Sequence, residues 1–392
     1  MVEPVRRFLA IEAAGGLLLM AATVVALAWA NSPWRHGYVD LWQHTIRVHA
    51  FGATLHGSLD HAVNDGLMVL FFFVVGLEIK REMVVGELRD RRTAALPAIA
   101  ALGGMVVPAL IFVAWNAGTA GSHGWGIPMA TDIAFALGVI TLLGERVPNG
   151  LKLFLLTLAI VDDIGAIVVI AVFYASDVRW AWGAAALALV GVVVICRAVG
   201  MSKTWIYVIV GLGLWFVTWR SGVHATVAGV VLGLLTPADE PSDETSVAAR
   251  LEERLHPWTS YVIVPIFALA NAGVALGGGF HGAGMRVLLG VGLGLLVGKV
   301  VGVAGATWLA VRLGLADLPE GARWGQVVGV ACVAGIGFTM SLFVTDLAFA
   351  GPETAALVDH AKVAVLCASV VAAAIGAGVL AFAGQHRRGA RG

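Results

Sequence analysis

Two adjacent aspartates stand near the middle of an apolar segment that is long enough to span a bilayer. Residues 153–173 carry no other charged side chain than those of Asp162 and Asp163. An ionised carboxylate at this depth costs about 2.5–3.5 kcal/mol on insertion scales, so acids kept there are usually functional. Buried carboxylates bind protons and small cations, and the pair therefore predicts ion transport. The alternative is a structural polar cluster.

Because they are adjacent, Asp162 and Asp163 project about 100° apart on a helix and cannot do identical work. One can face an aqueous funnel and bind the cation while the other faces a neighbouring helix. Lys299, in the middle of the apolar residues 290–305, is a candidate partner for either carboxylate. A fixed salt bridge with no transport role is the alternative for this lysine.

A third carboxylate, that of Asp132, lies in the middle of the apolar residues 124–143. Thr131 precedes it, and Pro128 stands one turn earlier. Proline removes a backbone hydrogen bond and kinks a helix, so we predict an interrupted helix here. The alternative is an intact helix with Thr131 and Asp132 pointing into the bundle.

A matching irregularity occurs late in the chain, where Gly335, Gly337 and Thr339 cluster in the middle of an apolar segment. Paired interruptions in the two halves of a carrier are the best sequence pointer to its binding site. We therefore predict inverted repeats whose two broken helices cross, with half-helix ends of like sign facing each other. Asp132 would offset the positive ends, and Lys299 is available for the negative ends.

The composition is that of a polytopic helical membrane protein. Hydrophobic residues make up 59% of the 392 residues and charged residues 13%, against about 25% charged in soluble domains. The formal net charge is zero, so nothing favours nucleic-acid binding, and we expect no cofactor. Apolar windows predict one all-α transporter domain, 1–392, with twelve spans. The spans are 11–30, 59–85, 95–116, 121–143, 150–175, 181–199, 204–219, 222–236, 254–276, 287–311, 325–349 and 357–383.

The lysines and arginines support an even number of spans. With the N-terminus in the cytoplasm, 18 of them fall on the cytoplasmic side and 5 on the outer side. Lys299 and Lys362 remain inside spans, and Lys362 is near enough to a span end to snorkel. By the positive-inside rule, both termini are predicted to be cytoplasmic. Between spans, we expect an outer β-hairpin or irregular loop at 45–58 and a cytoplasmic linker at 237–249.

Further charged residues and histidines gather near predicted helix ends. Because histidine changes charge between pH 5 and 8, they suggest a pH-sensing entrance. Solvated helix ends explain most of these charges equally well. The group comprises Glu78, Lys80, Arg81, Glu82, His224, Glu252, Glu253 and His256.

Taken together, these residues resemble those of the NhaA-type sodium/proton antiporters over nearly the whole chain. The motifs occur in family order and are together highly specific. They are NDGLMVLFFFVVGLEIKRE (64–82), ATDIAFALGV (130–139), LAIVDDIGAI (158–167), SGVHATVAGV (221–230), LHPWTSYVIVPIFALANAG (255–273), LVGKVVG (296–302) and GIGFTMSLF (335–343).

The resemblance implies twelve helices, of which four and eleven are broken and crossed. It implies a core of helices three to five and ten to twelve, and interface helices one, two, eight and nine. Asp162 and Asp163 would be the ion and proton site, with Asp132 and Lys299 at the crossing. A pH-regulated entrance and a homodimer joined through the 45–58 hairpin are also implied.

This chain departs from the family at two places. Val300 follows the buried lysine at a position where proline is frequent, so the sequence does not decide whether span ten is kinked there. Glu253 occupies a position where histidine can occur, which bears on the pH response.

The expected activity is electrogenic, pH-regulated export of Na⁺ or Li⁺ against external protons, across the bacterial inner membrane. It is not enzymatic. A light-driven retinal pump, a channel and a cation symporter for organic anions are the alternatives. The pump would use seven spans, and no core arginine is present for an organic anion.

Overall fold

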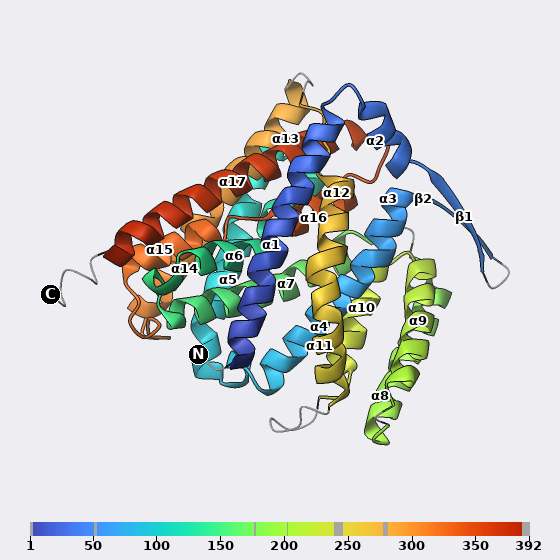
Figure 1. The fold of residues 1–392 in the computed structure, drawn as a ribbon, viewed down its shortest axis with the longest axis horizontal. Helices are drawn as coiled ribbons and strands as arrows, with labels where there is room; N and C mark the ends of the chain where they lie inside the picture. The colour runs from blue at the N-terminus through green and yellow to red at the C-terminus, as the bar shows by residue number, and fades with distance from the viewer. Residues whose placement is uncertain are drawn as a thin grey trace. The chain divides into compact units, whose positions relative to one another are not determined.

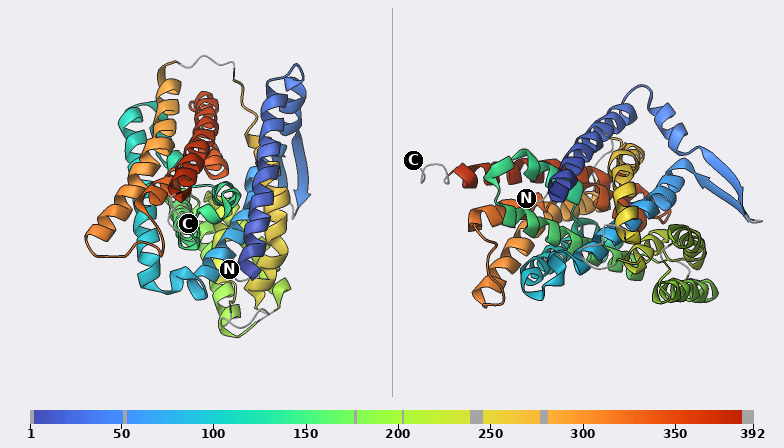
Figure 2. Two further views of the ribbon diagram at one scale, coloured as in Figure 1. Left: turned by 60° about the vertical axis from the view of Figure 1, so that its left-hand side comes forward. Right: turned by 60° about the horizontal axis from the view of Figure 1, so that its bottom comes forward.

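The structure is a computed structural model whose described part is nearly all helical (Figures 1 and 2). It divides into two compact units. Unit 1 comprises Met1–Leu17, Asp90–Ala166 and Val274–Gly392, and unit 2 comprises Leu18–Arg89 and Ile167–Gly273. The described residues are 3–50, 53–175, 178–201, 203–238, 246–276 and 281–385.

The long apolar helices confirm a polytopic membrane protein. Within the described residues, six helices are long and apolar enough to cross a bilayer, or up to nine if each bent pair is one span. The predicted count of twelve is not reached by this measure. One reason is the short predicted span eight, whose helix α10 (Ala225–Leu235) has 11 residues. Twelve spans, and the division into core and interface helices, stay predictions.

Unit 1 contains the residues of predicted spans three to five and ten to twelve, apart from the end of span five. Helix α17 packs along α13, α15 and α16, while α5 packs against α13 and α14. The elements are α5 (Arg91–Asn116), η3 (Ala120–Met129), α6 (Ile133–Leu142), η4 (Gly144–Arg146), α7 (Asn149–Phe173, continuing into unit 2), α13 (Gly282–Leu293), η6 (Gly294–Gly298), α14 (Lys299–Arg312), α15 (Trp324–Val333), α16 (Phe338–Ala348) and α17 (Ala355–Gln385).

Glycines bring the backbones of α5 and α14 close together. A Cβ atom at Gly302 would collide with the carbonyl oxygen of Gly103, and one at Gly103 would collide with that of Gly302. Small residues allow this approach in membrane helices, where van der Waals packing stabilises the contact. The contact fixes α14, the helix that begins with Lys299, against α5.

Both predicted helix interruptions are confirmed. The short helix η3, a 3₁₀ helix with Pro128 in its last turn, ends at Met129, and α6 begins at Ile133 with a bend of 42°. Helix α15 ends at Val333, and α16 begins at Phe338 with a bend of 46°. The crossing of the two broken helices and the inverted repeats stay predictions.

Span ten is continuous, and it has Val300 at the position where proline is frequent in the family. Gly282–Arg312 forms one helical span, and its distortion is the π-helical turn η6, immediately before Lys299. π-Turns inside α-helices are frequent at functional sites. Here Val300 keeps its backbone donor, and a widened turn precedes the lysine instead of a proline kink.

Unit 2 is built around α4 and α10, which touch through glycines. A Cβ atom at Gly76 would collide with the carbonyl oxygen of Val230, and one at Gly229 with that of Val69. Besides α10, the elements are α1 (Glu3–Ala30, beginning in unit 1), α2 (Arg35–Trp42), β1 (Thr45–Ala50), β2 (Ala53–Ser58), α3 (Leu59–His61), η1 (Ala62–Leu67), α4 (Met68–Val84), η2 (Glu87–Arg89), α8 (Trp180–Ala198), α9 (Thr204–Ser221), α11 (Val247–Trp258), η5 (Thr259–Ile263) and α12 (Val264–Asn271).

Strands β1 and β2 pair antiparallel, with Thr45 opposite Ser58 and Ala50 opposite Ala53. The residues that join them, 51 and 52, lie outside the described part, and the outer placement of a hairpin at 45–58 stays a prediction. Most of the predicted linker 237–249 also lies outside the described residues.

Candidate functional site

Asp132 sits in the extended segment between η3 and α6 and caps α6. Its φ and ψ are −83° and 104°, and its carboxylate accepts a hydrogen bond of 2.9 Å from the Phe135 amide. Its own amide donates to the Ile336 carbonyl at 2.7 Å. The two helix interruptions are therefore joined directly, backbone to backbone.

The second oxygen of the same carboxylate serves α16. Asp132 Oδ2 accepts from the Thr339 amide at 3.0 Å and from the Thr339 hydroxyl at 2.5 Å. One carboxylate thus occupies the N-terminal ends of α6 and α16, where the helix dipoles are positive. This is the arrangement expected for an acid that offsets two like half-helix ends.

Lys299 contacts the site through two hydrogen bonds. Its Nζ donates to Asp162 Oδ2 at 2.7 Å and to the Thr131 hydroxyl at 3.0 Å. Thr131 Oγ1 in turn donates to the Ala334 carbonyl at 2.9 Å. The lysine–aspartate pair is therefore linked to the break between α15 and α16. Of the two carboxylates open to Lys299 in the sequence, the ion pair uses that of Asp162.

These groups are shielded from solvent. Asp162 and Lys299 are 0% exposed, and Asp163 is 2% exposed. Asp162 Oδ1 is buried and accepts no hydrogen bond from the described residues, so this carboxylate has one oxygen available to a proton or cation. The described residues hold no cluster of three or more Asp, Glu, His or Cys side chains suited to a metal ion. A cation at this site would draw on hydroxyl and carbonyl oxygens besides the carboxylates.

Two serines of this site had no signal in the sequence. Ser369 Oγ, on α17, accepts a hydrogen bond of 3.2 Å from the Phe338 amide at the start of α16. Ser341 Oγ donates to the Ile127 carbonyl at 2.7 Å. Both satisfy backbone groups that the interruptions release. The flanking glycines are needed for space, since Cβ atoms at Gly335 and Gly337 would meet the Leu295 carbonyl and the Ser341 hydroxyl.

Lys362, which the sequence predicts to snorkel, forms an ion pair of 2.7 Å through its ammonium with Asp346 near the end of α16. Its extension to a membrane interface stays a prediction. Lys362 and Ser369 both stand on α17, seven residues apart, and so lie on one face of that helix. This face holds α16 near both of its ends.

In unit 2, five of the residues assigned to the entrance come together where α4 meets α11. Arg81 forms an ion pair with Glu252 and lies 3.8 Å from Glu82. His256 Nε2 lies 3.6 Å from Glu78 Oε1. Burial raises the pKa of Glu252 above its ordinary value, because desolvation outweighs the opposing charges of Arg81 and His256.

Three other residues assigned to the entrance do not join this cluster. Glu253 is exposed, and the charge that acts on Lys80 is that of Arg197. The grouping of His224 requires a correction: it precedes α10, and the charge acting on it is that of Asp65. The opposite end of α10 packs against α11 through Leu235, about 16 Å along the helix from its start.

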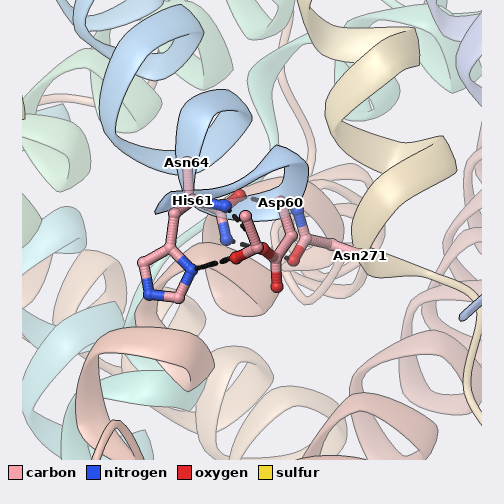
Figure 3. Close-up of polar contacts among 5 residues, drawn as sticks. Asp60, His61, Asn64 and Asn271 are labelled. Carbon is pink, nitrogen blue, oxygen red and sulfur yellow. Dashed lines mark hydrogen bonds and ion pairs between the residues drawn. The ribbon is translucent and has the colours of Figure 1, made fainter. Parts of the chain in front are cut away.

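The start of α4 carries a separate polar group (Figure 3). Asn271, at the end of α12, donates a hydrogen bond of 2.8 Å to Asn64 in the π-helical turn η1. His61 and Asp60 contact each other at 3.2 Å. The Trp215 indole donates to the Asp65 carbonyl at 3.3 Å. These contacts tie the distorted turn to α9 and α12, as expected for packing at a bulge.

Comparison with known proteins identifies relatives along the whole chain. A sequence profile described as Na⁺/H⁺ antiporter 1 matches residues 6–380. Na(+)/H(+) antiporter NhaA 2 of Pseudomonas syringae is 52% identical over 380 residues, covering 96% of this chain and 94% of the relative. Na(+)/H(+) antiporter NhaA 1 of Pseudomonas putida is 50% identical over 396 residues, covering 98% of both. Na(+)/H(+) antiporter NhaA of Yersinia enterocolitica is 47% identical over 393 residues, covering 99% of both.

Proposed function

The chain belongs to the Na⁺/H⁺ antiporter 1 family, as its motifs predicted, and on this premise we propose that it exports Na⁺ or Li⁺ from the cytoplasm in exchange for external protons. It is a multi-pass membrane transporter of the sodium/proton antiporter class. The proposal places it in the bacterial inner membrane with both termini in the cytoplasm. The charge asymmetry of the predicted loops, 18 against 5, supports that orientation.

The observation that carries the proposal is the buried Lys299–Asp162 pair and its link to the helix interruptions. In the proposed mechanism, Na⁺ binds deprotonated Asp163, and Asp162, Thr131 and Asp132 shape the site. A cation at the carboxylates competes with the attraction that holds Lys299, whose ammonium donates to both Asp162 and Thr131. Because Thr131 also donates to the Ala334 carbonyl, a change at the ion pair reaches the break before α16.

Coupling follows from the electrostatic cost of empty carboxylates. Ionised Asp162 and Asp163 without a bound cation cost free energy at membrane depth. Only a protonated or cation-bound site therefore reorients readily. Protons and Na⁺ then alternate at the same oxygens. The protein exchanges the two ions and does not let either one cross the membrane alone. Since both side chains are shielded, each ion reaches them only when the protein opens a path to the site.

Electrogenic exchange is part of the proposal, because the site has more than one place for a proton. Two carboxylates and one lysine amine can bind protons, whereas the cargo carries one charge. In one version, Lys299 releases a proton when Na⁺ displaces it from Asp162. A Lys299→Ala protein that kept an unchanged proton-to-cation ratio in proteoliposomes would contradict this version.

The main test is Na⁺-dependent dissipation of a pH gradient in vesicles, followed with a pH-sensitive dye. Asp163→Asn is expected to abolish the signal, because the neutral amide cannot alternate between a proton and a cation. Asp359→Asn is the matched control, since it removes an exposed aspartate of the same unit outside the site. Full activity in Asp163→Asn would overturn the assignment, whatever the control shows.

We further propose that the cluster of Glu78, Arg81, Glu82, Glu252 and His256 sets the pH response at the cytoplasmic entrance. The short distance between His256 and Glu78 supports this, because protonation of the histidine would create an ion pair. Dimerisation through residues 45–58 is part of the same family-based proposal. Cross-linking of single cysteines introduced at residues 45 and 58 tests it, and a wholly monomeric product would count against it.

A further inference from the structure

Two arginines meet at one end of the α8–α9 pair, outside the proposed transport site. Helices α8 and α9 pack side by side in unit 2 (Figure 1). The Arg179 amide donates to the Ser221 carbonyl at 2.8 Å, which joins the start of α8 to the end of α9. Arg220, next to Ser221, therefore lies at the same end as Arg179.

Arg220 is stacked on an aromatic cluster. Its guanidinium carbon lies 5.1 Å from the centre of the Trp182 ring. Trp182 is edge-on to Phe216 at 6.2 Å, and Phe216 lies 6.3 Å from Trp219. The stacking holds the guanidinium plane through cation–π attraction. A cation–π contact uses the charge of the guanidinium and does not use its N–H groups as donors.

One of these donors is both buried and unsatisfied. Arg220 Nε is inaccessible to solvent and donates no hydrogen bond within the described part of the chain. Buried polar atoms almost always have a partner, and each exception requires an explanation. The C-terminal position on α9 gives the positive charge a favourable dipole but supplies no acceptor for Nε. Because Nε is closed to solvent, a ligand from outside would meet the other N–H groups of the guanidinium, to which the described residues offer no acceptor.

The surroundings select an anionic lipid headgroup. Only 6% of the most apolar window of α8 is buried, so this span offers its sides to acyl chains. Trp180 is 83% exposed and Trp219 is 38% exposed, as is typical of tryptophans at the level of lipid headgroups. Guanidinium groups bind phosphate oxygens bidentately. With Arg179 exposed beside it, the site has two positive charges against the one negative charge of Asp177, two residues before Arg179 in the sequence, and this net positive charge complements a headgroup of net negative charge.

We propose that Arg220, held on Trp182 and assisted by Arg179, binds the phosphate of an anionic phospholipid at the end of the α8–α9 pair. The acyl chains of this lipid lie along α8. Phosphatidylethanolamine fits less well, because its own ammonium group opposes the two arginines.

The test compares lipid retention by the full-length protein in native mass spectrometry. The probes are phosphatidylglycerol and phosphatidylethanolamine of equal chain length. The wild-type protein is expected to retain phosphatidylglycerol preferentially, and Arg220→Gln to reduce this retention about tenfold, since charge-assisted pairs are the strong ones. Arg220→Lys keeps the positive charge but loses the paired N–H donors of the guanidinium. Its lipid retention should lie between those of the wild-type protein and Arg220→Gln. Arg312→Gln is the matched control: Arg312 lies 5.0 Å from the ring centre of Trp308, but it is exposed.

Several outcomes would overturn the proposal. Equal retention by the wild-type protein and Arg220→Gln would do so, as would an equal loss in Arg312→Gln, which would indicate general charge attraction. Displacement of the lipid by millimolar inorganic phosphate would indicate a site for soluble anions. A shift from dimer to monomer in Arg220→Gln without lipid loss would assign the surface to a second copy. If Arg220→Gln fails to fold, Arg220→Lys and Trp182→Leu provide the same comparison.

Discussion

Two lysine–aspartate pairs in unit 1 have the same geometry and different surroundings. In both Lys299–Asp162 and Lys362–Asp346, the nitrogen and oxygen are 2.7 Å apart. The first pair is completely buried, whereas the side chains of the second are 10% and 20% exposed. Because the second pair is partly exposed, solvent offsets part of the cost of separating its charges. Separating the first leaves a charge in a low-dielectric interior.

The pairs also differ in what they hold. Lys299 donates to Thr131 as well, so its pair is continuous with the segment between η3 and α6. Lys362 binds α17 to the far end of α16, and Ser369 binds α17 to the near end. The partly exposed pair Lys362–Asp346 thus positions the half-helix α16. The fully buried pair Lys299–Asp162 contacts the segment that separates η3 from α6. The lesson is that solvent access, more than distance, separates a structural ion pair from one suited to chemistry.

Replacing the lysine of each pair by alanine should give the largest difference in stability between the two pairs. Lys299→Ala should lower the free energy of unfolding by about 3–5 kcal/mol, because it leaves the Asp162 carboxylate buried and uncompensated. Lys362→Ala should lower it by less, about 1–2 kcal/mol, because Asp346 is partly exposed and can be partly hydrated. Chemical unfolding of the purified proteins in one detergent, followed by intrinsic fluorescence, measures both. Equal losses in the two variants would contradict the comparison.

A double variant sharpens the same prediction. Lys299→Leu combined with Asp162→Leu removes both charges, and stability should recover to within about 1 kcal/mol of the wild-type protein. Transport should be lost, because Asp162 no longer shapes the cation site and Asp163 is the one carboxylate of the pair left to bind a proton. A double variant as unstable as Lys299→Ala would show that the penalty arises from lost packing.

Asp132 gives the next largest effect, since one carboxylate caps two helices. Asp132→Ala should cost about 2 kcal/mol, about 1 kcal/mol for each lost N-cap. Asp132→Asn retains a single acceptor oxygen and should cost about half as much. Thermal unfolding followed by circular dichroism distinguishes the three proteins. An alanine variant no less stable than the asparagine variant would argue against the double cap.

Ser369→Ala should have a smaller effect. It removes the acceptor of the Phe338 amide and should lower the free energy of unfolding by about 1 kcal/mol. Ser369→Thr keeps a hydroxyl and serves as the control. Hydrogen exchange of the first amides of α16 gives a direct measurement, and unchanged protection in Ser369→Ala would contradict the contact.

The charges of the site could be predicted because each is costly in an apolar span. Asp132, Asp162, Asp163 and Lys299 are conspicuous for that reason alone. The sequence could not choose between the two carboxylates as the partner of Lys299, because that choice depends on the rotation of α7 and α14 about their axes. Ser369 was missed because a serine in an apolar helix has no distinctive pattern.

The interruptions were predictable, but their form was not. Pro128 marked the first break and the glycines Gly335 and Gly337 marked the second. The 3₁₀ geometry of η3 and the π-turn before Lys299 depend on tertiary packing, which overrides local propensity. The misplacement of His224 has a similar origin, since hydropathy windows do not show which end of a short helix meets a charged neighbour.

A third ion pair, Arg81–Glu252 in unit 2, extends the comparison to two partners of unequal exposure and gives the smallest predicted effect. Its side chains are 40% and 9% exposed. Burial raises the pKa of Glu252, so the folded protein binds the extra proton between the ordinary pKa and the raised one. Stability from this group is therefore fully present below the ordinary pKa and is lost as the pH rises through the raised value.

Glu252→Gln removes this titration, so the free energy of unfolding should no longer fall as the pH rises through the raised pKa of Glu252. The change should be about 1 kcal/mol or less, because Arg81 is partly hydrated. The measurement is the difference in thermal midpoint between the two proteins across a pH series. Glu253→Gln is the matched control, because it removes the same charge from the neighbouring exposed position. A wild-type protein that becomes more stable relative to Glu252→Gln as the pH rises would reverse the sign, and would show that the attraction to Arg81 outweighs the burial of Glu252. Glu252 would then resemble the carboxylate of the partly exposed Lys362–Asp346 pair.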